Sequence, residues 1–181
     1  MNQDRLNVLL NTPRMFWVEL KNENTTAGLF DFIQKYLNEH SVGVEVGSFQ
    51  GVSSEMFALC VGHLTCVDPF AIGDPEIDKH LSDAEIVFDE MAKGYNNITK
   101  LKLTSVEAAK LFPDDSLDFV YIDGMHDYEN CRADIEAWYP KVKKGGIVAG
   151  HDHNYPDVAS AVRGTVKYVE IFSDYTWARV K

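Results

Sequence analysis

Short apolar runs alternate with amphipathic, helix-like segments along most of the 181 residues. The apolar runs are rich in β-branched residues, which is typical of strands that are buried on both faces of a sheet. Strands are predicted at 42–46, 64–67, 98–103, 117–123 and 147–149. Helices are predicted around them at 51–61, 82–94, 105–111, 128–139 and 157–168. This alternation predicts a doubly wound α/β fold with a mostly parallel sheet and helices on both faces.

The C-terminal end of the chain predicts a different strand direction. Two further strands are expected at 168–172 and 175–180, which brings the predicted sheet to seven strands. Only Ser173 and Asp174 separate these two segments, so no crossover helix fits between them and they must run antiparallel. The expected fold is therefore a seven-stranded, Rossmann-like sheet with an antiparallel last strand.

The N-terminal 40 residues have a helical rather than a strand-like pattern. Thr25 or Thr26 is a suitable N-cap for a helix whose apolar residues recur at helical spacing up to Leu37. We expect residues 1–40 to form an N-terminal helical cap on a main domain at 41–181, the two making one compact domain. Residues 70–81 are predicted as a loop, and a capping-box pattern at 82–85 predicts where the next helix begins.

Composition excludes several classes of partner. The formal net charge of −11 disfavours nucleic acid, since binding a polyanion requires a basic patch. No run of roughly 18 to 20 apolar residues is present, so we expect no membrane association. The three cysteines form no CxxC pair, and the first residues do not have the pattern of a signal peptide, so we expect a cytoplasmic protein.

Residues suited to binding a nucleotide-like cofactor follow the first three predicted strands. Gly47 and Gly51 come after the first strand and allow a tight turn with close backbone approach to a ligand. Asp68 follows the second strand and is placed to accept both hydroxyls of a ribose, and Ser105 follows the third, where an adenine edge would lie. Phe49 occupies the place of the second glycine in G-x-G-x-x-G, which disfavours a nicotinamide-dependent dehydrogenase. Each residue alone has an ordinary structural explanation, because glycines after a strand often only form a turn.

Acidic and histidine side chains follow the fourth and fifth predicted strands. Asp123 and His126 lie after the fourth, and His151 and Asp152 lie after the fifth. If these strands are neighbours, their ends lie about 5 Å apart and the two aspartates converge. Oxygen ligands of this kind favour Mg²⁺, Mn²⁺ or Ca²⁺ over zinc. The structural alternative is that Asp152 caps the turn before Pro156 and that the histidines are ordinary polar loop residues.

Three segments together resemble a known family. VEVGSFQGVS, CVDPF and the block from Tyr121 to Asp152 resemble class I S-adenosylmethionine-dependent methyltransferases, and most closely the subgroup that contains macrolide-sugar O-methyltransferases such as macrocin O-methyltransferase. Catechol O-methyltransferase is a more distant relative. The resemblance covers about residues 41–153 and implies a methyltransferase domain within 41–181.

The resemblance implies a role for each matching residue. The methionine part of S-adenosylmethionine would lie against Glu45, Gly47, Ser48 and Gly51, its ribose against Asp68, and its adenine against Ser105 and Val106. Asp123 and Asp152 would hold a magnesium-like ion, with His151 as a third ligand in a place where relatives often have an acid, and His126 would be the general base. His151 departs from the family pattern because imidazole is a poor ligand for magnesium. Met125 is a second departure, because some relatives have an acid at that position.

The implied reaction is methyl transfer to a hydroxyl of a sugar or another small natural product. Two alternatives remain open. The first is a metal-dependent hydrolase that uses the group formed by His126, Asp127, His151, Asp152 and His153. The second is a non-catalytic paralogue that binds S-adenosylmethionine without turnover. The expected partner is a small-molecule acceptor, and apolar residues near the N-terminus are compatible with a homo-oligomer.

Overall fold

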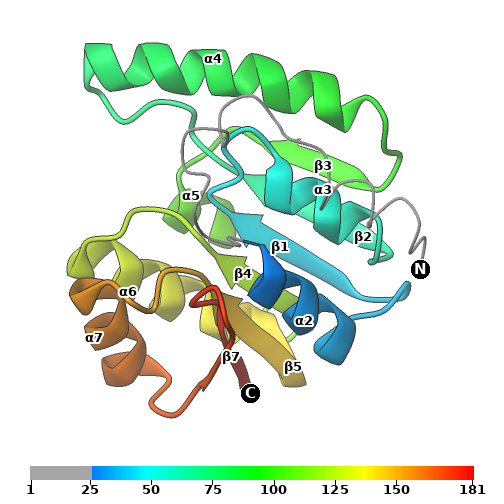
Figure 1. The fold of residues 1–181 in the computed structure, drawn as a ribbon, viewed down its shortest axis with the longest axis vertical. Helices are drawn as coiled ribbons and strands as arrows, with labels where there is room; N and C mark the ends of the chain where they lie inside the picture. Colours follow the sequence, from blue (N-terminus) through cyan, green and yellow to red (C-terminus); the bar gives the residue numbers. More distant parts are fainter. Residues whose placement is uncertain (1–25) are drawn as a thin grey trace.

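The computed structural model describes residues 26–181, which form three layers with a mixed sheet between two layers of helices (Figure 1). The strands are β1 (Val42–Val46), β2 (His63–Val67), β3 (Ile98–Leu101), β4 (Leu117–Ile122), β5 (Val142–Gly150), β6 (Glu170–Ile171) and β7 (Trp177–Val180). The helices are α2 (Ala27–Tyr36), α3 (Val52–Ala58), α4 (Pro75–Ala92), α5 (Ser105–Ala109), α6 (Tyr128–Trp138) and α7 (Pro156–Thr165), with a short 3₁₀ helix, η1 (Tyr139–Lys141).

The seven strands have the order β3-β2-β1-β4-β5-β7-β6. β1 to β5 are parallel, whereas β7 is antiparallel to both β5 and β6. The predicted doubly wound α/β sheet with an antiparallel finish is thus confirmed. The order reverses between β1 and β4, so the carboxyl ends of these two strands border the crevice in which such sheets bind ligands.

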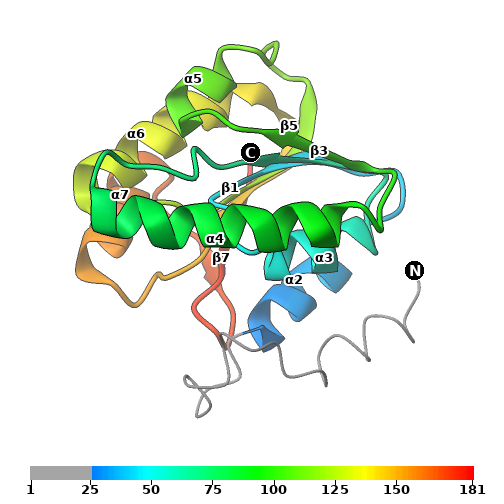
Figure 2. The same ribbon diagram turned by 90° about the horizontal axis from the view of Figure 1, so that it is seen from above.

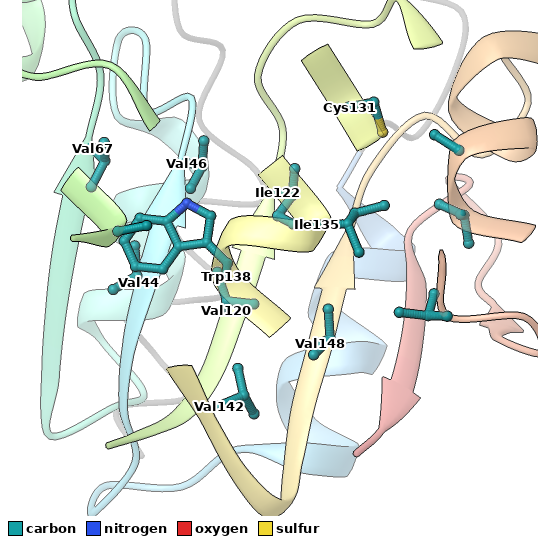
Figure 3. Packing of buried hydrophobic residues seen from close by; sticks show 14 of the residues in the cluster. Val44, Val46, Val67, Val120, Ile122, Cys131, Ile135, Trp138, Val142 and Val148 are labelled. Carbon is teal, nitrogen blue, oxygen red and sulfur yellow. The ribbon is translucent and has the colours of Figure 1, made fainter. Parts of the chain in front are cut away.

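Each face of the sheet has its own apolar core. On one face, side chains from β1, β4 and β5 pack against Ile135 and Trp138 of α6 and against α5 and α7 (Figure 3). On the other face, Phe32 of α2 and Phe57 of α3 pack against Tyr121 of β4, and Phe88 of α4 packs against Phe70 in the same cluster. Figure 2 shows α2, α3 and α4 together below the sheet and α5 and α6 above it. The two cores fix the strands in place, and because these strands are parallel, their carboxyl ends all lie at the same end of the sheet.

The loop predicted at 70–81 is wrong, because α4 already begins at Pro75. Asp74 is its N-cap, and the Asp74 side chain accepts hydrogen bonds from the backbone N–H groups of Glu76 and Ile77. Proline is favoured in the first turn of a helix, so Asp74-Pro75 is the stronger start signal. The capping-box pattern at 82–85 consequently lies inside the helix.

Two strand boundaries also differ from the prediction. β3 ends at Leu101, two residues early, and β5 begins at Val142, so Gly145 and Gly146 lie within a strand rather than before it. Gly145 has a φ of 82°, and the register between β4 and β5 shifts at this point. A positive φ lets glycine accommodate such an irregularity inside a strand.

The N-terminal part of the chain is described from residue 26 onward. The predicted helix is present as α2 with Thr26 as N-cap, but the Thr26 side chain makes no capping hydrogen bond. Asp174, in the turn between β6 and β7, instead accepts a 2.7 Å hydrogen bond from the backbone N–H of Leu29. Residues 1–25 of the cap predicted at 1–40 lie outside the described residues, and the domain boundary at residue 40 stays a prediction. Among residues 26–181, no helix has the length and hydropathy required to cross a membrane.

Asp174→Ala is expected to lower the free energy of unfolding by about 2–6 kcal/mol, since each buried N–H that loses its acceptor costs about 1–3 kcal/mol. Two backbone N–H groups would lose their acceptor, because Asp174 also accepts from the backbone N–H of Thr176 at 2.9 Å. Urea denaturation would measure the effect. Asp31→Ala, which removes an exposed carboxylate from the same helix α2, is the control. A loss below about 1 kcal/mol in Asp174→Ala would show that α2 does not depend on this cap.

Candidate active site

The loop after β1 is held close to the ends of β2 and β4. Gly47 has a φ of 87°, and its N–H donates to the carbonyl of Val67 at 2.8 Å. A Cβ at this position would lie 2.0 Å from the carbonyl oxygen of Asp123. Any side chain at Gly47 would therefore push the loops after β1 and β4 apart. Gly51, with a φ of 82°, is the N-cap of α3, and Phe49 between them also has a positive φ of 44°.

Two buried polar atoms beside this loop lack a partner. Glu45 of β1 is fully buried, and its Oε2 accepts a hydrogen bond from the hydroxyl of Ser54 on α3. Neither Glu45 Oε1 nor the Ser48 hydroxyl has a hydrogen-bond partner among the described residues. Burial raises the pKa of Glu45 to about 7. Buried polar atoms are rarely left unpaired, so this pair of atoms indicates a place for a polar ligand group.

Asp68 lies where β2 ends, next to the same loop. Its carboxylate is buried and accepts hydrogen bonds from the backbone N–H groups of Phe49 at 2.9 Å and Phe70 at 2.7 Å. Burial raises the pKa of Asp68, although these two hydrogen bonds oppose the rise. The carboxylate is thus fixed in orientation, and each oxygen keeps a lone pair for a ligand hydroxyl.

Ser105 and Val106 begin α5, beyond the end of β3. The Ser105 hydroxyl accepts a 2.9 Å hydrogen bond from the indole Nε1 of Trp138 and, next to the carboxyl group of Asp134, opposes the rise of that group's pKa. It is therefore already engaged with α6. Val106 is 41% exposed, which leaves its side chain available to an apolar ligand surface.

The acidic and histidine residues after β4 and β5 converge as predicted. Ile122 pairs with Gly150 in the sheet, so the two loops leave neighbouring strands side by side. His126 Nε2 lies 2.9 Å from Asp152 Oδ2 and 3.7 Å from Asp123 Oδ1. One candidate ligand atom from each of these three residues lies within 4.8 Å of the others, a grouping suited to a metal ion. The carboxylates of Asp123 and Asp152 raise the pKa of His126 to about 10.

His151 takes a different position from the one predicted. Its Nδ1 lies 3.2 Å from Asp152 Oδ1, and its Nε2 is buried without a partner among the described residues. Burial lowers the pKa of His151, but Asp152 and Asp123 outweigh that effect and raise it to about 9. The group of potential ligands contains His126 and not His151. Burial raises the pKa of Asp152, but the two imidazoles more than offset this and hold it well below its usual range.

Other polar residues of these loops do not belong to the group formed by Asp123, His126 and Asp152. Asp127 is the N-cap of α6, where its carboxylate accepts from the backbone N–H of Asn130 at 3.0 Å. Burial lowers the pKa of His153, and the charge of Arg163 lowers it further. The ring of Tyr155 lies beside the imidazole of His126, with 5.3 Å between the ring centres.

Sequence reasoning missed the buried carboxylate of Asp134. This residue lies on the sheet-facing side of α6, is 6% exposed and is adjacent to Ser105. An acid at an apolar position of an amphipathic helix was the available signal, because Cys131, Ile135 and Trp138 define the same buried face.

Comparison with known proteins identifies the family. A family described as "methyltransferase domain" matches residues 44–153, which is more than half of the chain. The chain belongs to this methyltransferase family. The class I S-adenosylmethionine-dependent methyltransferase predicted from the sequence is thereby confirmed, and S-adenosylmethionine is the cofactor of that family.

Individual relatives of this methyltransferase are distant. An uncharacterized protein of Sinorhizobium fredii is 32% identical over 116 residues, which cover 60% of this chain and 13% of that protein. The chain therefore spans a small part of that relative's length.

Solved structures share the fold at low sequence identity. A putative methyltransferase of Streptococcus mutans, solved in complex with S-adenosylhomocysteine, has a TM-score of 0.62 at 12% identity, covering 83% of this chain and 92% of that one. CalS11, a TDP-rhamnose 3'-O-methyltransferase of calicheamicin biosynthesis, has a TM-score of 0.58 at 18% identity, covering 97% and 90%. These likenesses confirm the class I methyltransferase fold.

Proposed function

We propose that this methyltransferase transfers the methyl group of S-adenosylmethionine to a hydroxyl of a sugar or another small natural product, with help from a divalent cation. The convergence of Asp123, His126 and Asp152 at the carboxyl ends of β4 and β5 carries the proposal. The sugar O-methyltransferase among the structural relatives supports a hydroxyl acceptor of this kind.

The cofactor fits the residues at the ends of β1, β2 and β3. The unpartnered atoms of Glu45 and Ser48 are suited to the polar groups of the methionine part, which Gly47 and Gly51 allow to approach the backbone. The fixed carboxylate of Asp68 is suited to the two ribose hydroxyls. We assign Ser105 and Val106 to the border of the adenine. When bound, S-adenosylmethionine supplies an electrophilic methyl carbon on a sulfonium sulfur.

The carboxylates of Asp123 and Asp152 fit a divalent cation such as Mg²⁺. Carboxylates with open water positions suit this ion, which rarely receives an all-protein ligand shell. When bound, the cation supplies positive charge that lowers the pKa of a nearby hydroxyl. The His151 imidazole was a predicted third ligand. Because its Nδ1 faces Asp152, we propose that His151 instead orients that carboxylate.

His126 is the proposed general base. Without a cation, its raised pKa means that it holds a proton at neutral pH and forms an ion pair with both aspartates. A cation on these carboxylates would cancel the charge that stabilises this proton, and the neutral imidazole could then accept one. The neutral imidazole of His126 would accept the hydroxyl proton at Nε2, while the acceptor oxygen would take the methyl group that the bound cofactor supplies.

The titration of His126 tests this arrangement. In chelated protein the imidazole is expected to titrate near pH 10 by NMR, and saturating Mg²⁺ is expected to move its pKa down toward neutrality. His63, at the amino end of β2, is the internal control, and the chemical shifts of its ring protons at a fixed pH should not change when the ion is added. An unchanged His126 titration in the presence of Mg²⁺ or Mn²⁺ would contradict a cation on Asp123 and Asp152.

The hydrolase alternative has less support. It requires Asp127 as part of the site, but this side chain caps α6. It also gives no role to the unpartnered atoms beside the loop after β1. A non-catalytic paralogue would bind S-adenosylhomocysteine and methylate none of a panel of glycosides and phenols.

A further inference from the structure

Asp134 is a charged residue at a position where the fold requires an apolar one. It lies on α6 between Cys131 and Trp138, and all three side chains are buried on the side of the helix that faces the sheet. Burying a carboxylate is costly unless hydrogen bonds compensate, and a well-packed apolar residue of similar volume is often at least as stable. Packing alone therefore does not account for the aspartate. Such local conflicts concentrate at functional sites.

The neighbours of the Asp134 carboxylate come from two segments of the proposed site, the start of α5 and the loop after β4. One neighbour is the hydroxyl of Ser105, the first residue of α5, which accepts from Trp138 Nε1 at 2.9 Å and lies close enough to Asp134 to lower the pKa of its carboxyl group. Figure 3 shows the indole nitrogen of Trp138 on the side of the ring near Val46, the last residue of β1. The hydrogen bond between Trp138 and Ser105 thus lies toward the carboxyl ends of the strands, with Asp134 beside it.

The second neighbour is Gly124, in the loop after β4. A Cβ at Gly124 would lie 3.3 Å from Asp134 Oδ2 and 3.7 Å from Val46 Cγ1. The backbone of Gly124 therefore lies next to the Asp134 carboxylate and the end of β1, with little space for a side chain between them. Burial raises the pKa of Asp134 to about 6, against the opposing effect of the Ser105 hydrogen bond, which is consistent with a carboxylate that has few donors around it.

We propose that Asp134 is a positioning residue that fixes the start of α5, through Ser105, relative to the loop that carries Asp123 and His126. This inference rests on the proposed function, in which these two segments border the adenine and carry the reaction. Asp134 touches neither cofactor nor acceptor and acts through Ser105 and Gly124. Its loss lets Ser105 leave its position and lets the Gly124 backbone shift, so that the cofactor site is no longer preorganised.

The test is the affinity for S-adenosylhomocysteine, measured by calorimetry on the full chain. Asp134→Ala is expected to weaken binding at least tenfold. Asp134→Asn keeps an oxygen that accepts from Ser105 and is expected to stay within about threefold of the wild type. Cys131→Ala, which removes a buried side chain from the same face of α6, is the control for lost packing and should bind as the wild type does.

Each outcome decides a separate question. Wild-type affinity in a folded Asp134→Ala variant with a lowered melting temperature would overturn the inference and leave a purely structural residue. Equal weakening in Asp134→Asn and Cys131→Ala would overturn it as well. If Asp134→Ala does not fold, Asp134→Ser replaces it, because the shorter side chain does not reach Ser105. Failure of the wild type to bind S-adenosylhomocysteine would instead contradict the proposed function itself.

Discussion

Replacing His126 with alanine is expected to slow methyl transfer by about 10² to 10⁴, the usual contribution of a positioned general base. Affinity for S-adenosylhomocysteine should stay within about threefold of the wild type, because His126 contacts Asp123 and Asp152 and not the loop after β1. Turnover is measured as transfer of a radiolabelled methyl group to a glycoside or phenol that the wild type methylates. Affinity for S-adenosylhomocysteine is measured by calorimetry.

The matched control for this substitution is His63→Ala. His63 lies at the amino end of β2 and hydrogen-bonds to Thr99, so its loss should leave turnover unchanged. Parallel loss of turnover and of cofactor affinity in His126→Ala would assign His126 a structural role. Full activity in that variant would remove the general base from the mechanism.

Asp68→Ala is expected to weaken S-adenosylhomocysteine binding by about 100-fold or more, since hydrogen bonds to a charged group contribute about 1.5–3 kcal/mol each and two ribose hydroxyls would lose their acceptor. The loop after β1 would also lose its anchor, because Asp68 accepts from the backbone N–H of Phe49. Calorimetry at a temperature well below the melting transition separates this effect from unfolding.

Asp118→Ala is the control for Asp68. It removes a carboxylate that pairs with Lys143 and accepts from the backbone of Val42, at the opposite end of the sheet. Its affinity for the cofactor product should match the wild type. Wild-type binding by Asp68→Ala would contradict a ribose site at the end of β2.

The general placement of the site follows from the sequence because parallel strands put their carboxyl ends at one edge. Asp68, Asp123 and Asp152 each follow an apolar run, and the order of the runs determines which loops meet. The predicted beginning of α4 is wrong because the sequence carries two helix-start signals, and the helix begins at the stronger one, Asp74-Pro75, rather than at the capping pattern at 82–85.

Side-chain pairing within the site could not be predicted in the same way. Asp152 has a φ of 59°, and the direction of its carboxylate depends on this uncommon backbone conformation. As a result, His126 and not His151 joins the two aspartates. Asp134 and Asp174 also escaped prediction, because their partners, Ser105 and Leu29, are 29 and 145 residues away in the sequence.

The most direct test of the central claim is a calorimetric titration of the wild-type protein with S-adenosylhomocysteine, with and without Mg²⁺. The account predicts one site with a dissociation constant on the order of micromolar, about −8 kcal/mol. The absence of binding at millimolar ligand under both conditions would contradict a functional cofactor site at the ends of β1 and β2.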